Sequence, residues 1–393
     1  MKVLQIIVTL DPRYGGPVNV CLEMSRELAR LGAQVTIFTT KLGFPSGKRS
    51  DIQRGETCQA GIRICYFPVQ FRPMAFSLQM AAALWRKIRE YDIVHIHGLY
   101  RFPQTFAAWC ARRQGVPYII TTHGTLDPFL FHHPRHLKLK RVYERLFALQ
   151  NLNDAATIHF TTQEEQKLVS YLQLQAPGVV IPIGVDWHRF RDLPSPGRFR
   201  DYLGLKNNEQ IILHLGRIHF KKGLDLLVKG FSIVADVLPN AKLVIAGPDN
   251  DGYGKEVRRW IAEKNLEDRL YFPGMIKGQQ VLEAYIDADI FALASYTESF
   301  GIAVVEAMAC ACPVVISDKV NIWRDIQEAN AGMVVQCKAK AVGSAILQLI
   351  EDPHRRHTMG LAGRDFVRIN YNWEQIGHQV MDLYHNLTRS SIA

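Results

Sequence analysis

Short runs of β-branched and other apolar residues alternate with helix-like segments along the whole chain. The first run, residues 3–9, is followed by a Gly-Gly-Pro turn at 15–17 and by apolar positions at helical spacing over 18–29. This alternation is typical of parallel α/β sheets. Predicted strands cover 3–9, 34–40, 93–96, 118–121, 157–160, 179–183, 211–215, 242–246, 270–272, 290–294, 314–317 and 333–335; predicted helices include 18–29, 224–234, 255–264, 302–309 and most of the last ~50 residues.

A Pro/Gly/Arg-rich stretch at 193–198 interrupts the alternation and predicts a linker. The strand–helix pattern then begins again, and a length of 393 residues also favours two domains. We therefore expect an α/β fold of two Rossmann-like βαβ domains that face each other across a cleft. The predicted divisions are 1–190, 191–370 and a C-terminal helix at 371–393 that packs back on the first domain.

Composition excludes two broad classes of protein. A hydrophobic content of 48% with 10% aromatic residues excludes a disordered chain, and no apolar run approaches the ~18 residues of a membrane-spanning helix. The apolar N-terminus is short and lacks a small-residue cleavage site, so it predicts a buried first strand and a cytoplasmic protein. The seven cysteines form no CxxC pair and no zinc spacing, which predicts reduced thiols.

The net charge of +10 is confined to the first half of the chain. Residues 1–190 hold 23 Lys and Arg against 13 Asp and Glu, whereas residues 191–393 hold 24 of each kind. A one-sided basic surface predicts an anionic partner, such as a nucleic acid, acidic lipid headgroups or a phosphorylated substrate. A basic face kept for solubility is the alternative. Because no basic-aromatic RNA motif is present, we do not expect nucleic acid.

Unusual residues follow several predicted strands, where open α/β sheets bind their ligands. Gly15 and Gly16 begin a helix after the first strand, and such glycines let backbone amides approach a phosphate. The segment 216–223 places Arg217 and Lys222 on a loop that enters a helix, which suits a diphosphate. Single surface cations and turn glycines are common, so each feature alone also fits a role without a ligand.

Two glutamates flank the start of the predicted helix 302–309. Glu298 lies in the preceding loop, and Glu306 lies within an otherwise apolar run. A carboxylate suits a vicinal diol because each oxygen accepts one hydroxyl, and the helix amides can face hydroxyls or phosphate. A charge in an apolar run is rarely buried without a partner, which favours a functional role for Glu306.

These motifs together resemble glycosyltransferase family 4, whose members are retaining enzymes of the GT-B fold that use nucleotide sugars. The resemblance covers essentially the whole chain. Its specific parts are the G-R-x-x-x-x-K-G segment at 216–223 and the E-x7-E segment at 298–306. The N-terminal match is looser. The matching segments are Gly15-Gly16, Gly184-Val185-Asp186, Gly216-Arg217 with Lys222-Gly223, Gly247-Pro248, and Glu298 with Glu306.

The resemblance implies a role for each matching residue. Arg217 and Lys222 would hold the diphosphate and stabilise it as it leaves, Glu306 would bind the ribose, and Glu298 would hold the hexose. His123 would line the sugar near its anomeric carbon. The implied catalytic set is His123, Arg217, Lys222 and Glu298. The implied set for sugar-donor binding is Gly15, Gly16, Gly216, Arg217, Lys222, Met275, Ile276, Glu298, Ser299, Phe300, Gly301, Ile302, Ala303 and Glu306.

The same resemblance implies a donor domain at 191–370, an acceptor-side domain at 1–190, and no cofactor or metal. UDP-glucose is the expected sugar donor, GDP-mannose the alternative, and a saccharide or lipid-linked saccharide the expected acceptor in cell-surface or extracellular polysaccharide synthesis. Another GT-B enzyme, such as a sugar-nucleotide epimerase, and a non-catalytic nucleotide-sugar-binding subunit are the competing functions. We assign the triplets Asp249-Asn250-Asp251 and Asp287-Ala288-Asp289 to loops and helix caps rather than to a metal.

Two further features bear on partners. The segment 135–149 is basic and amphipathic, and together with residues 129–131 it predicts contact with an anionic membrane at the inner face of the cytoplasmic membrane. An ordinary helix packed on the sheet is equally compatible with the pattern. Among the histidines near strand ends, we expect His97 to face the cleft and His95 to be structural.

Overall fold

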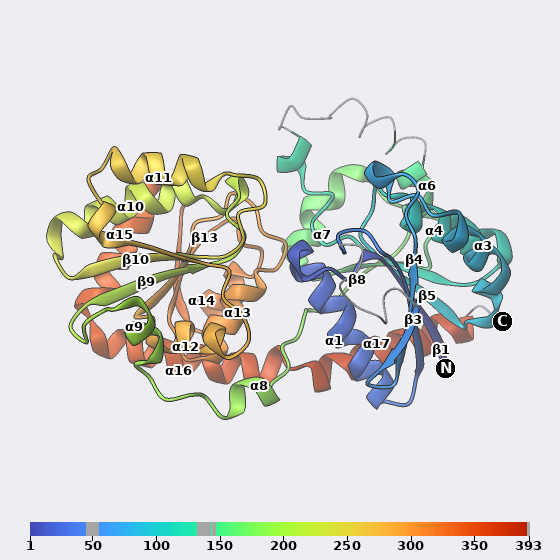
Figure 1. Cartoon of the computed structure of the whole chain (residues 1–393). Helices are drawn as coiled ribbons and strands as arrows, with labels where there is room; N and C mark the ends of the chain where they lie inside the picture. The colour runs from blue at the N-terminus through green and yellow to red at the C-terminus, as the bar shows by residue number, and fades with distance from the viewer. Residues whose placement is uncertain (45–54, 132–142, 144–146, 391–393) are drawn as a thin grey trace. The chain divides into compact units, whose positions relative to one another are not determined.

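The computed structural model describes residues 1–44, 55–131, 143 and 147–390 (Figure 1). These residues form two compact units. Unit 1 comprises Met1–Gly184 and the chain from Trp373 onward, and unit 2 comprises Val185–Asn372. None of the described helices is long and apolar enough to cross a membrane.

Unit 1 contains an eight-stranded sheet in the order β3-β4-β2-β1-β5-β6-β7-β8. Its neighbouring strands are parallel except for the β3–β4 pair, which is antiparallel. Side chains alternate between faces, so Leu4 and Ile6 enter the core beneath the helices α3 and α4, while Gln5 points to the other face, toward α17. The elements are β1 (Lys2–Thr9), α1 (Gly16–Arg30), β2 (Gln34–Thr40), β3 (Glu56–Gln59), β4 (Ile62–Phe67), α3 (Leu78–Lys87), β5 (Ile93–His97), α4 (Phe102–Gln114), β6 (Tyr118–Thr121), α6 (Leu149–Asn153), β7 (Thr157–Phe160), α7 (Gln163–Val169), β8 (Gly178–Val180) and α17 (Trp373–Ser390).

Unit 2 contains a six-stranded parallel sheet in the order β11-β10-β9-β12-β13-β14. The helices α10, α11 and α15 cover one face, and α12, α13 and α16 lie on the other (Figure 1). The elements are α8 (His188–Arg191), α9 (Arg198–Leu203), β9 (Gln210–Leu215), α10 (Leu224–Val237), β10 (Ala241–Ala246), α11 (Gly254–Ala262), β11 (Leu270–Gly274), α12 (Gln279–Asp287), β12 (Ile290–Leu293), α13 (Ile302–Ala309), β13 (Val314–Ser317), α14 (Trp323–Glu328), β14 (Gly332–Val335), α15 (Ala339–Glu351) and α16 (Pro353–Asn370).

The division between the units differs from the predicted linker at 193–198. The Val185 N–H donates to the Tyr371 carbonyl at 2.8 Å, which ties the chain to unit 2 from this point. Gly184 packs so closely on Trp373 that a Cβ there would lie 2.8 Å from the Trp373 nitrogen. The Pro- and Gly-rich stretch lies within unit 2, so the linker prediction is wrong.

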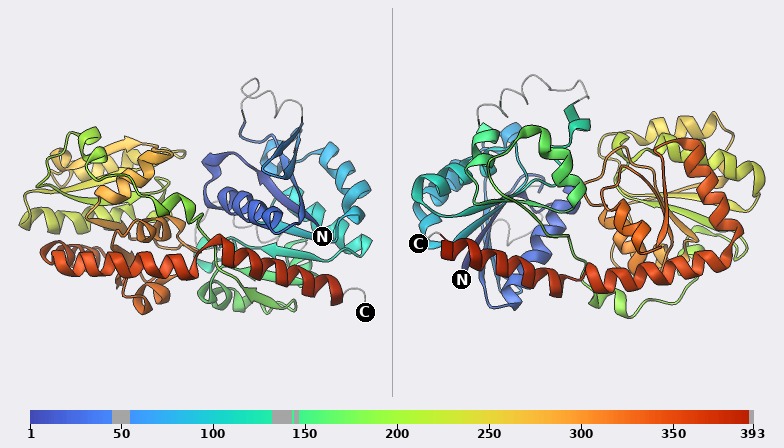
Figure 2. Two further views of the ribbon diagram at one scale, coloured as in Figure 1. Left: turned by 90° about the horizontal axis from the view of Figure 1, so that it is seen from below. Right: turned by 180° about the vertical axis from the view of Figure 1, so that it is seen from behind.

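The C-terminal helix α17 belongs to unit 1, although most of the sequence before it belongs to unit 2. It lies beside α1 (Figure 2). Its Tyr384 is fully buried and reaches the sheet, where its hydroxyl contacts side chains of β1 and β5. The chain therefore crosses between the units twice.

The sequence analysis did not predict two strands of unit 1, β3 and β4. The edge strand β3 is mostly exposed and polar, and β4 alternates buried Ile62 and Ile64 with exposed Arg63. The ion pair between Arg63 and Glu56 links the two strands across their antiparallel pairing. Such a short polar hairpin lacks the continuous apolar run that marks the buried parallel strands.

Candidate active site

Three loops meet at the carboxyl ends of β9, β10 and β11 in unit 2. The Gly216 N–H donates to the Ala246 carbonyl at 2.9 Å, and the Gly247 N–H donates to the Gly274 carbonyl at 2.8 Å. Gly247 has φ +146°, and a Cβ there would lie 1.8 Å from the Gly216 oxygen. The predicted Gly247-Pro248 motif therefore exists because this backbone crossing leaves no room for a side chain.

The Lys222 ammonium and the Glu298 carboxylate form an ion pair in unit 2, although they are 76 residues apart. Both side chains are largely buried, with 16% and 21% exposed. Lys222 ends a 3₁₀ turn after β9, and the adjacent Gly223 has φ +62°, where a Cβ would lie 1.9 Å from the Ala294 oxygen. The tight approach of the two loops brings these charges together.

Backbone contacts hold the Glu298 loop in place. The Tyr296 N–H donates to the Lys221 carbonyl at 2.8 Å, and the Glu298 N–H donates to the Lys319 carbonyl at 3.1 Å. The Tyr296 hydroxyl also donates to Asp225 at 2.7 Å. The loop after β12 is thus fastened both to the Lys222 turn and to the loop after β13.

Glu306 lies on α13 and is partly buried. Its carboxylate accepts a hydrogen bond from the Tyr285 hydroxyl at 3.1 Å, and Tyr285 is fully buried on α12. Burial raises the pKa of Glu306, while the charge of Arg189 and the Tyr285 hydrogen bond act in the opposite direction. The partner expected for a carboxylate in this apolar run is therefore Tyr285.

The first turn of α13 follows Gly301, whose φ is +86°. A Cβ at Gly301 would lie 3.0 Å from Val320, and Phe300 is buried with its ring against Tyr371. Ser299, Ile302 and Ala303 are partly exposed. The Val304 N–H of this turn donates to the Gly301 carbonyl at 2.8 Å, whereas the first N–H groups of a helix have no acceptor within the helix itself.

The other predicted donor-site residues of unit 2 lie at the ends of the same strands. Arg217 is exposed and has no side-chain hydrogen bond or ion pair to other described residues. Met275 is 41% exposed and Ile276 is buried, directly after Gly274. Unit 2 therefore gathers Gly216, Arg217, Lys222, Met275, Ile276 and the residues 298–306 at one edge of its sheet, because parallel strands end on the same side.

Unit 1 holds the remaining predicted residues. Gly15 has φ +80° and ψ −142°, a conformation that favours glycine, and Gly16 begins α1. No heavy atom lies within 4 Å of a Cβ built at Gly16. His123 follows β6 and has φ +48°, which is unusual for a residue with a side chain.

The buried Glu165 of α7 holds the backbone around His123. Its Oε1 accepts hydrogen bonds from the Thr122 hydroxyl at 2.6 Å and the Gly124 N–H at 2.7 Å. Its Oε2 accepts from the Thr161 N–H and hydroxyl, both at 2.8 Å. Glu165 is only 2% exposed, so its charge is offset by these four donors. It fastens the strained His123 turn to the end of β7.

His97 differs from its predicted orientation. Its side chain is 2% exposed and lies within unit 1, where Nδ1 lies 3.0 Å from His123 Nε2 and Nε2 lies 2.8 Å from Gln5 Oε1. The prediction that it faces the cleft is wrong, because the side chain is buried and both ring nitrogens contact residues of unit 1. The position of His97 at a strand end does not indicate that the side chain is buried. The alternation of β5 does, because it places His97 on the same face as the buried His95.

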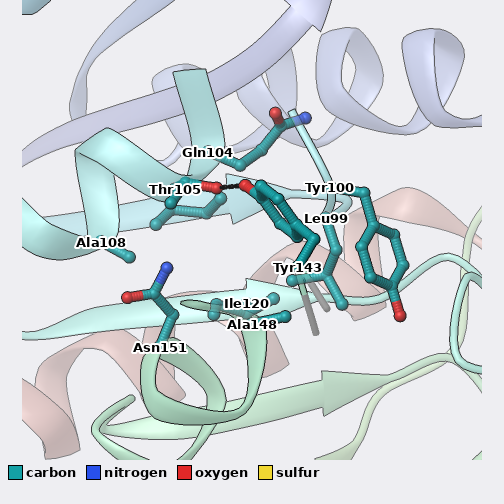
Figure 3. Close-up of a pocket in the computed structure, with 10 residues that line it drawn as sticks. Leu99, Tyr100, Gln104, Thr105, Ala108, Ile120, Tyr143, Ala148 and Asn151 are labelled. Carbon is teal, nitrogen blue, oxygen red and sulfur yellow. Dashed lines mark hydrogen bonds between the residues drawn. The ribbon is translucent and has the colours of Figure 1, made fainter. Parts of the chain in front are cut away.

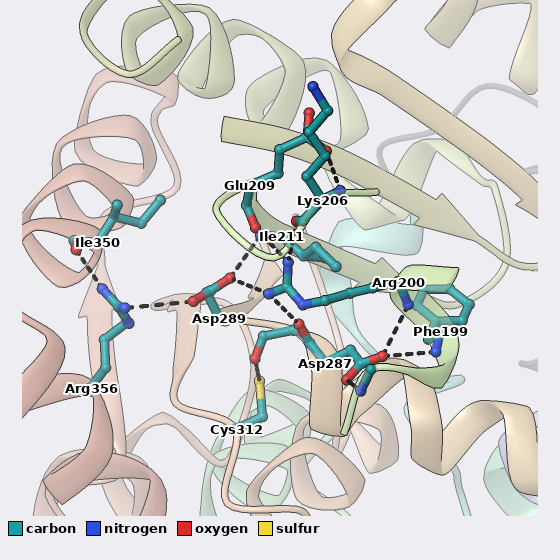
Figure 4. Close-up of polar contacts among 12 residues, drawn as sticks. Phe199, Arg200, Lys206, Glu209, Ile211, Asp287, Asp289, Cys312, Ile350 and Arg356 are labelled. Carbon is teal, nitrogen blue, oxygen red and sulfur yellow. Dashed lines mark hydrogen bonds and ion pairs between the residues drawn. The ribbon is translucent and has the colours of Figure 1, made fainter. Parts of the chain in front are cut away.

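The two Asp-x-Asp triplets serve the fold, as predicted. Asp287 accepts hydrogen bonds from the N–H groups of Gly197, Phe199 and Arg200 at 2.5, 2.7 and 3.0 Å (Figure 4). Asp289 accepts from the Ile211 N–H at 2.9 Å and pairs with Arg200. In the other triplet, Asp249 accepts from the Gly254 N–H at 3.1 Å, at the start of α11. Among the described residues, no group of three or more potential ligands could hold a metal ion.

Most of the predicted membrane segment 135–149 lies outside the described residues. Tyr143 is described, and its side chain points into a small cavity of unit 1, where its hydroxyl contacts the Thr105 hydroxyl (Figure 3). Leu99, Ala108 and Ile120 also line this cavity. Tyr143 thus packs on the protein, whereas Phe147 is 48% exposed.

Sequence reasoning missed Glu165 and Tyr285. Neither belongs to a glycine-rich loop, and each acts through a contact between distant segments. The T-T-Q-E run at 161–164, followed by Glu165, was the one available signal, because a threonine before a helix with an acidic residue three positions later is a capping pattern. Thr162 does cap α7 by accepting from the Glu165 N–H at 3.0 Å.

Comparison with known proteins agrees with this arrangement. The model for "Glycosyltransferase Family 4" matches residues 14–189, and the model for "Glycosyl transferases group 1" matches residues 197–366. The chain belongs to glycosyltransferase family 4. It is a glycosyltransferase, and the predicted family and enzyme class are confirmed.

Similar proteins cover almost the whole chain. The GDP-mannose:cellobiosyl-diphosphopolyprenol alpha-mannosyltransferase of Xanthomonas campestris is 26% identical, with 98% of this chain and 97% of that protein covered. A GDP-mannose-dependent phosphatidylinositol monomannoside mannosyltransferase of Mycolicibacterium smegmatis is 25% identical over 96% of this chain and 97% of its own.

Solved structures establish the fold. Sucrose-phosphate synthase of Thermosynechococcus elongatus matches with a TM-score of 0.79 and 24% identity over 99% of both chains. HepE of Anabaena, solved in complex with UDP-glucose, matches with a TM-score of 0.76 and 20% identity over 98% of this chain and 100% of that chain. The predicted GT-B fold class is confirmed.

Proposed function

We propose that this chain is a retaining hexosyltransferase that moves glucose from UDP-glucose to a saccharide acceptor, the lipid-linked intermediate of a cell-surface or extracellular polysaccharide. The observation that carries the proposal is the joint placement of Lys222, Glu298 and Glu306 at one strand-end edge of unit 2. A cation, a carboxylate for hydroxyls and a second carboxylate for a ribose are the groups that a nucleotide diphosphate hexose requires.

The diphosphate would bind between Lys222, Arg217 and the first turn of α13. Negative charge grows on the diphosphate as its bond to the sugar breaks, so these cations would stabilise the transition state more than the ground state. Arg217 is exposed and Lys222 is already oriented by its turn. We assign the transfer to attack on the same face that the diphosphate leaves, with the departing phosphate oxygen accepting the proton of the acceptor.

The sugar would contact Glu298 and the amides of Phe300 and Gly301, and the ribose would contact Glu306. The base would lie against the backbone of residues 273–276, where Gly274 has φ +74°. His123 and Gly16 of unit 1 would approach the sugar and the phosphates. The residues proposed for these roles supply no metal ligand set, and we propose that the reaction needs no metal.

Similar proteins favour two different sugar donors. HepE of Anabaena was solved with UDP-glucose, which supports the first candidate. The relatives in Xanthomonas and Mycolicibacterium are named for GDP-mannose, which supports a mannosyltransferase as the second candidate. Contacts to the base would come mainly from backbone groups here, so the ligand assay must decide between uridine and guanosine.

The acceptor proposal rests on charge. The first half of the chain carries a net charge of +10, and the two named mannosyltransferases act on diphosphopolyprenol or phosphatidylinositol carriers. A phosphate-bearing acceptor would be attracted to such a surface. We accordingly place the reaction at the inner face of the cytoplasmic membrane.

A thermal-shift screen tests the sugar donor directly. The purified chain would be heated with UDP, GDP, ADP, UDP-glucose and GDP-mannose, each in the presence of EDTA. A ligand that binds only the folded chain raises the midpoint of unfolding. A shift with UDP and UDP-glucose supports the proposal, and a shift confined to GDP and GDP-mannose replaces glucose by mannose. A shift with none of them contradicts the donor site.

Product analysis tests the reaction class. The sugar donor found in the screen would be incubated with the enzyme and a lipid-linked saccharide mixture, and the anomeric configuration of the product measured by NMR. Retention supports the proposal, whereas inversion or release of an epimerised nucleotide sugar overturns it.

A further inference from the structure

A chain of hydrogen bonds crosses the interior of unit 1 and ends at His123. We call it the histidine network. Its bonds connect β1, β5, β6, β7 and α17, so it joins segments that are far apart in the sequence. Its members are Gln5, His95, His97, Thr121, His123, His159 and Tyr384.

The proton positions can be derived from one end of the network. The Ile181 carbonyl can only accept, so His159 Nε2, at 2.8 Å, must carry a proton. A neutral His159 then has a bare Nδ1, which accepts from the Thr121 hydroxyl at 2.9 Å. Because the single proton of that hydroxyl is donated to His159, its oxygen accepts a hydrogen bond from His95 Nε2 at 2.6 Å. His95 is therefore also protonated on Nε2.

The same reasoning continues to the other end. The bare Nδ1 of His95 accepts from the Tyr384 hydroxyl at 2.5 Å, so the Tyr384 oxygen accepts from the Gln5 amide nitrogen at 3.3 Å. Gln5 must then turn its Oε1 to His97, whose Nε2 donates across 2.8 Å. The bare Nδ1 of His97 accepts from His123 Nε2 at 3.0 Å.

Every histidine in this sequence of bonds is neutral. Burial lowers the pKa of His123 to about 3 and of His159 to about 4. Burial likewise lowers the pKa values of His95 and His97 well below the usual range. A single proton on each ring is the condition that the derivation needs.

We propose that the histidine network sets the tautomer of His123, with the proton on Nε2, so that Nδ1 is kept as an acceptor for a hydroxyl of the bound sugar. His123 is partly exposed, and its Nδ1 has no hydrogen-bond partner elsewhere in the described chain. The step to the sugar rests on the proposed function; the tautomer does not. Gln5, His97 and Tyr384 are positioning residues, because they act on the sugar only through His123.

The Tyr384 hydroxyl fixes the orientation of the Gln5 side-chain amide. Without its hydroxyl, nothing in the network forces the Gln5 amide nitrogen to face α17. The amide could then rotate and donate to His97, which would reverse the proton order and place the proton of His123 on Nδ1. The C-terminal helix thus controls which ring nitrogen of His123 is available.

Nuclear magnetic resonance tests the tautomer without any substrate. The full chain would be labelled with 15N-histidine, and long-range 1H–15N correlations recorded near neutral pH, with the His123 signals assigned by their loss in His123→Gln. We expect an unprotonated Nδ1 and a protonated Nε2. A protonated Nδ1, or an average of the two forms, overturns the proposal. Because no sugar donor is present, a wrong choice of sugar leaves this result unchanged.

A substitution tests the role of Tyr384. Tyr384→Phe is compared with Tyr118→Phe, which removes a buried hydroxyl of unit 1 that donates to the Asn151 carbonyl at 2.7 Å outside the network. We expect Tyr384→Phe to populate the Nδ1-protonated form of His123 and to lower kcat by about 2- to 10-fold, the equivalent of one hydrogen bond. Tyr118→Phe should change neither.

An unchanged His123 tautomer and kcat in a folded Tyr384→Phe enzyme would overturn the role of Tyr384. Should that variant fail to fold, the spectrum of the natural sequence still decides the tautomer. A changed tautomer with unchanged kcat would overturn the contact between Nδ1 and the sugar while leaving the hexosyltransferase function intact.

Discussion

Lys222 and Glu298 form an ion pair at the carboxyl-end edge of the unit 2 sheet. Each belongs to a different strand-end loop, and the backbone bond from the Tyr296 N–H to the Lys221 carbonyl holds the loops together at 2.8 Å. Glu298 thereby neutralises the cation that we assign to the diphosphate. A bound nucleotide sugar must compete with the Glu298 carboxylate for the Lys222 ammonium. We therefore expect substitutions of Lys222 and of Glu298 to have different effects on nucleotide binding and turnover.

Lys222→Ala should lower kcat by about 10²- to 10³-fold, because it removes a charge that stabilises the leaving diphosphate. Lys229→Ala is the matched control, since Lys229 is an exposed lysine on α10. Steady-state kinetics of both variants would test this, with circular dichroism to confirm folding. Full activity in Lys222→Ala would show that the site is assigned wrongly.

Glu298→Gln should have opposite effects on the binding of the nucleotide and on the binding of the hexose. Without its counter-charge, Lys222 should bind UDP several-fold more tightly, since its ammonium is no longer shared between a carboxylate and the diphosphate. The neutral amide should hold the hexose hydroxyls less well than a carboxylate. Calorimetric titration with UDP and with UDP-glucose would compare the two affinities. Weaker binding of UDP itself would argue against the shared role of Lys222.

The sequence predicts the buried strands of both sheets well and the site only in part. Strands such as β13 are continuous apolar runs, which few other elements produce. Residues on the loops after them could be singled out because glycines and charges interrupt the apolar pattern. Lys222 and Glu298 were found in this way, each from its own loop.

Contacts between distant segments could not be predicted in the same way. The pairing of Lys222 with Glu298, and of Tyr285 with Glu306, depends on how two loops or helices meet. His97 was misjudged because its position at a strand end was given more weight than the alternation that places it on the same face as the buried His95. The linker prediction failed for a related reason. Prolines and glycines indicate a turn but not its tertiary contacts, and here the Asp287 carboxylate holds the turn inside unit 2 by accepting from the Gly197 N–H.

Glu306→Gln should stabilise the protein at neutral pH while weakening nucleotide binding. Burial raises the pKa of Glu306, so above that pKa the folded chain holds a carboxylate that the unfolded chain hydrates better. Replacing it removes this cost, and the gain in the free energy of unfolding should vanish as pH falls below the ordinary glutamate pKa, where both states are protonated.

Chemical denaturation of the natural sequence and of Glu306→Gln between acid and neutral pH would measure this difference. The affinity for UDP should fall about 10-fold in the variant, as expected for lost charge-assisted hydrogen bonds. A difference in the free energy of unfolding between Glu306→Gln and the natural sequence that grows toward acid pH would contradict this prediction. Tyr285→Phe keeps the carboxylate and should weaken UDP binding less.

Asp287→Ala should destabilise unit 2 by about 2 to 3 kcal/mol, because the N–H groups of Gly197, Phe199 and Arg200 lose their acceptor. Asp251→Ala is the control, since Asp251 belongs to the other triplet and its side chain is 63% exposed. Urea denaturation would measure both. A metal role for the triplets would instead appear as activity lost on adding EDTA, with little change in the stability of either variant.

Gly247→Ala should be far more damaging than Gly252→Ala, although both glycines have positive φ. Gly247 has φ +146° and a Cβ there would lie 1.8 Å from the Gly216 oxygen, whereas Gly252 has φ +70° and open space around it. We expect a loss of about 1 kcal/mol for Gly252→Ala from backbone conformation alone. Gly247→Ala should cost at least about 3 kcal/mol, because the two backbones must separate.

The displacement should also reach the proposed diphosphate site, since Gly216 precedes Arg217 and its N–H is bonded to the Ala246 carbonyl at 2.9 Å. Nucleotide affinity, measured by calorimetry on the folded fraction, should therefore fall in Gly247→Ala and stay unchanged in Gly252→Ala. Equal stability and equal affinity in the two variants would mean that the crossing of Gly247 over Gly216 does not position the loop.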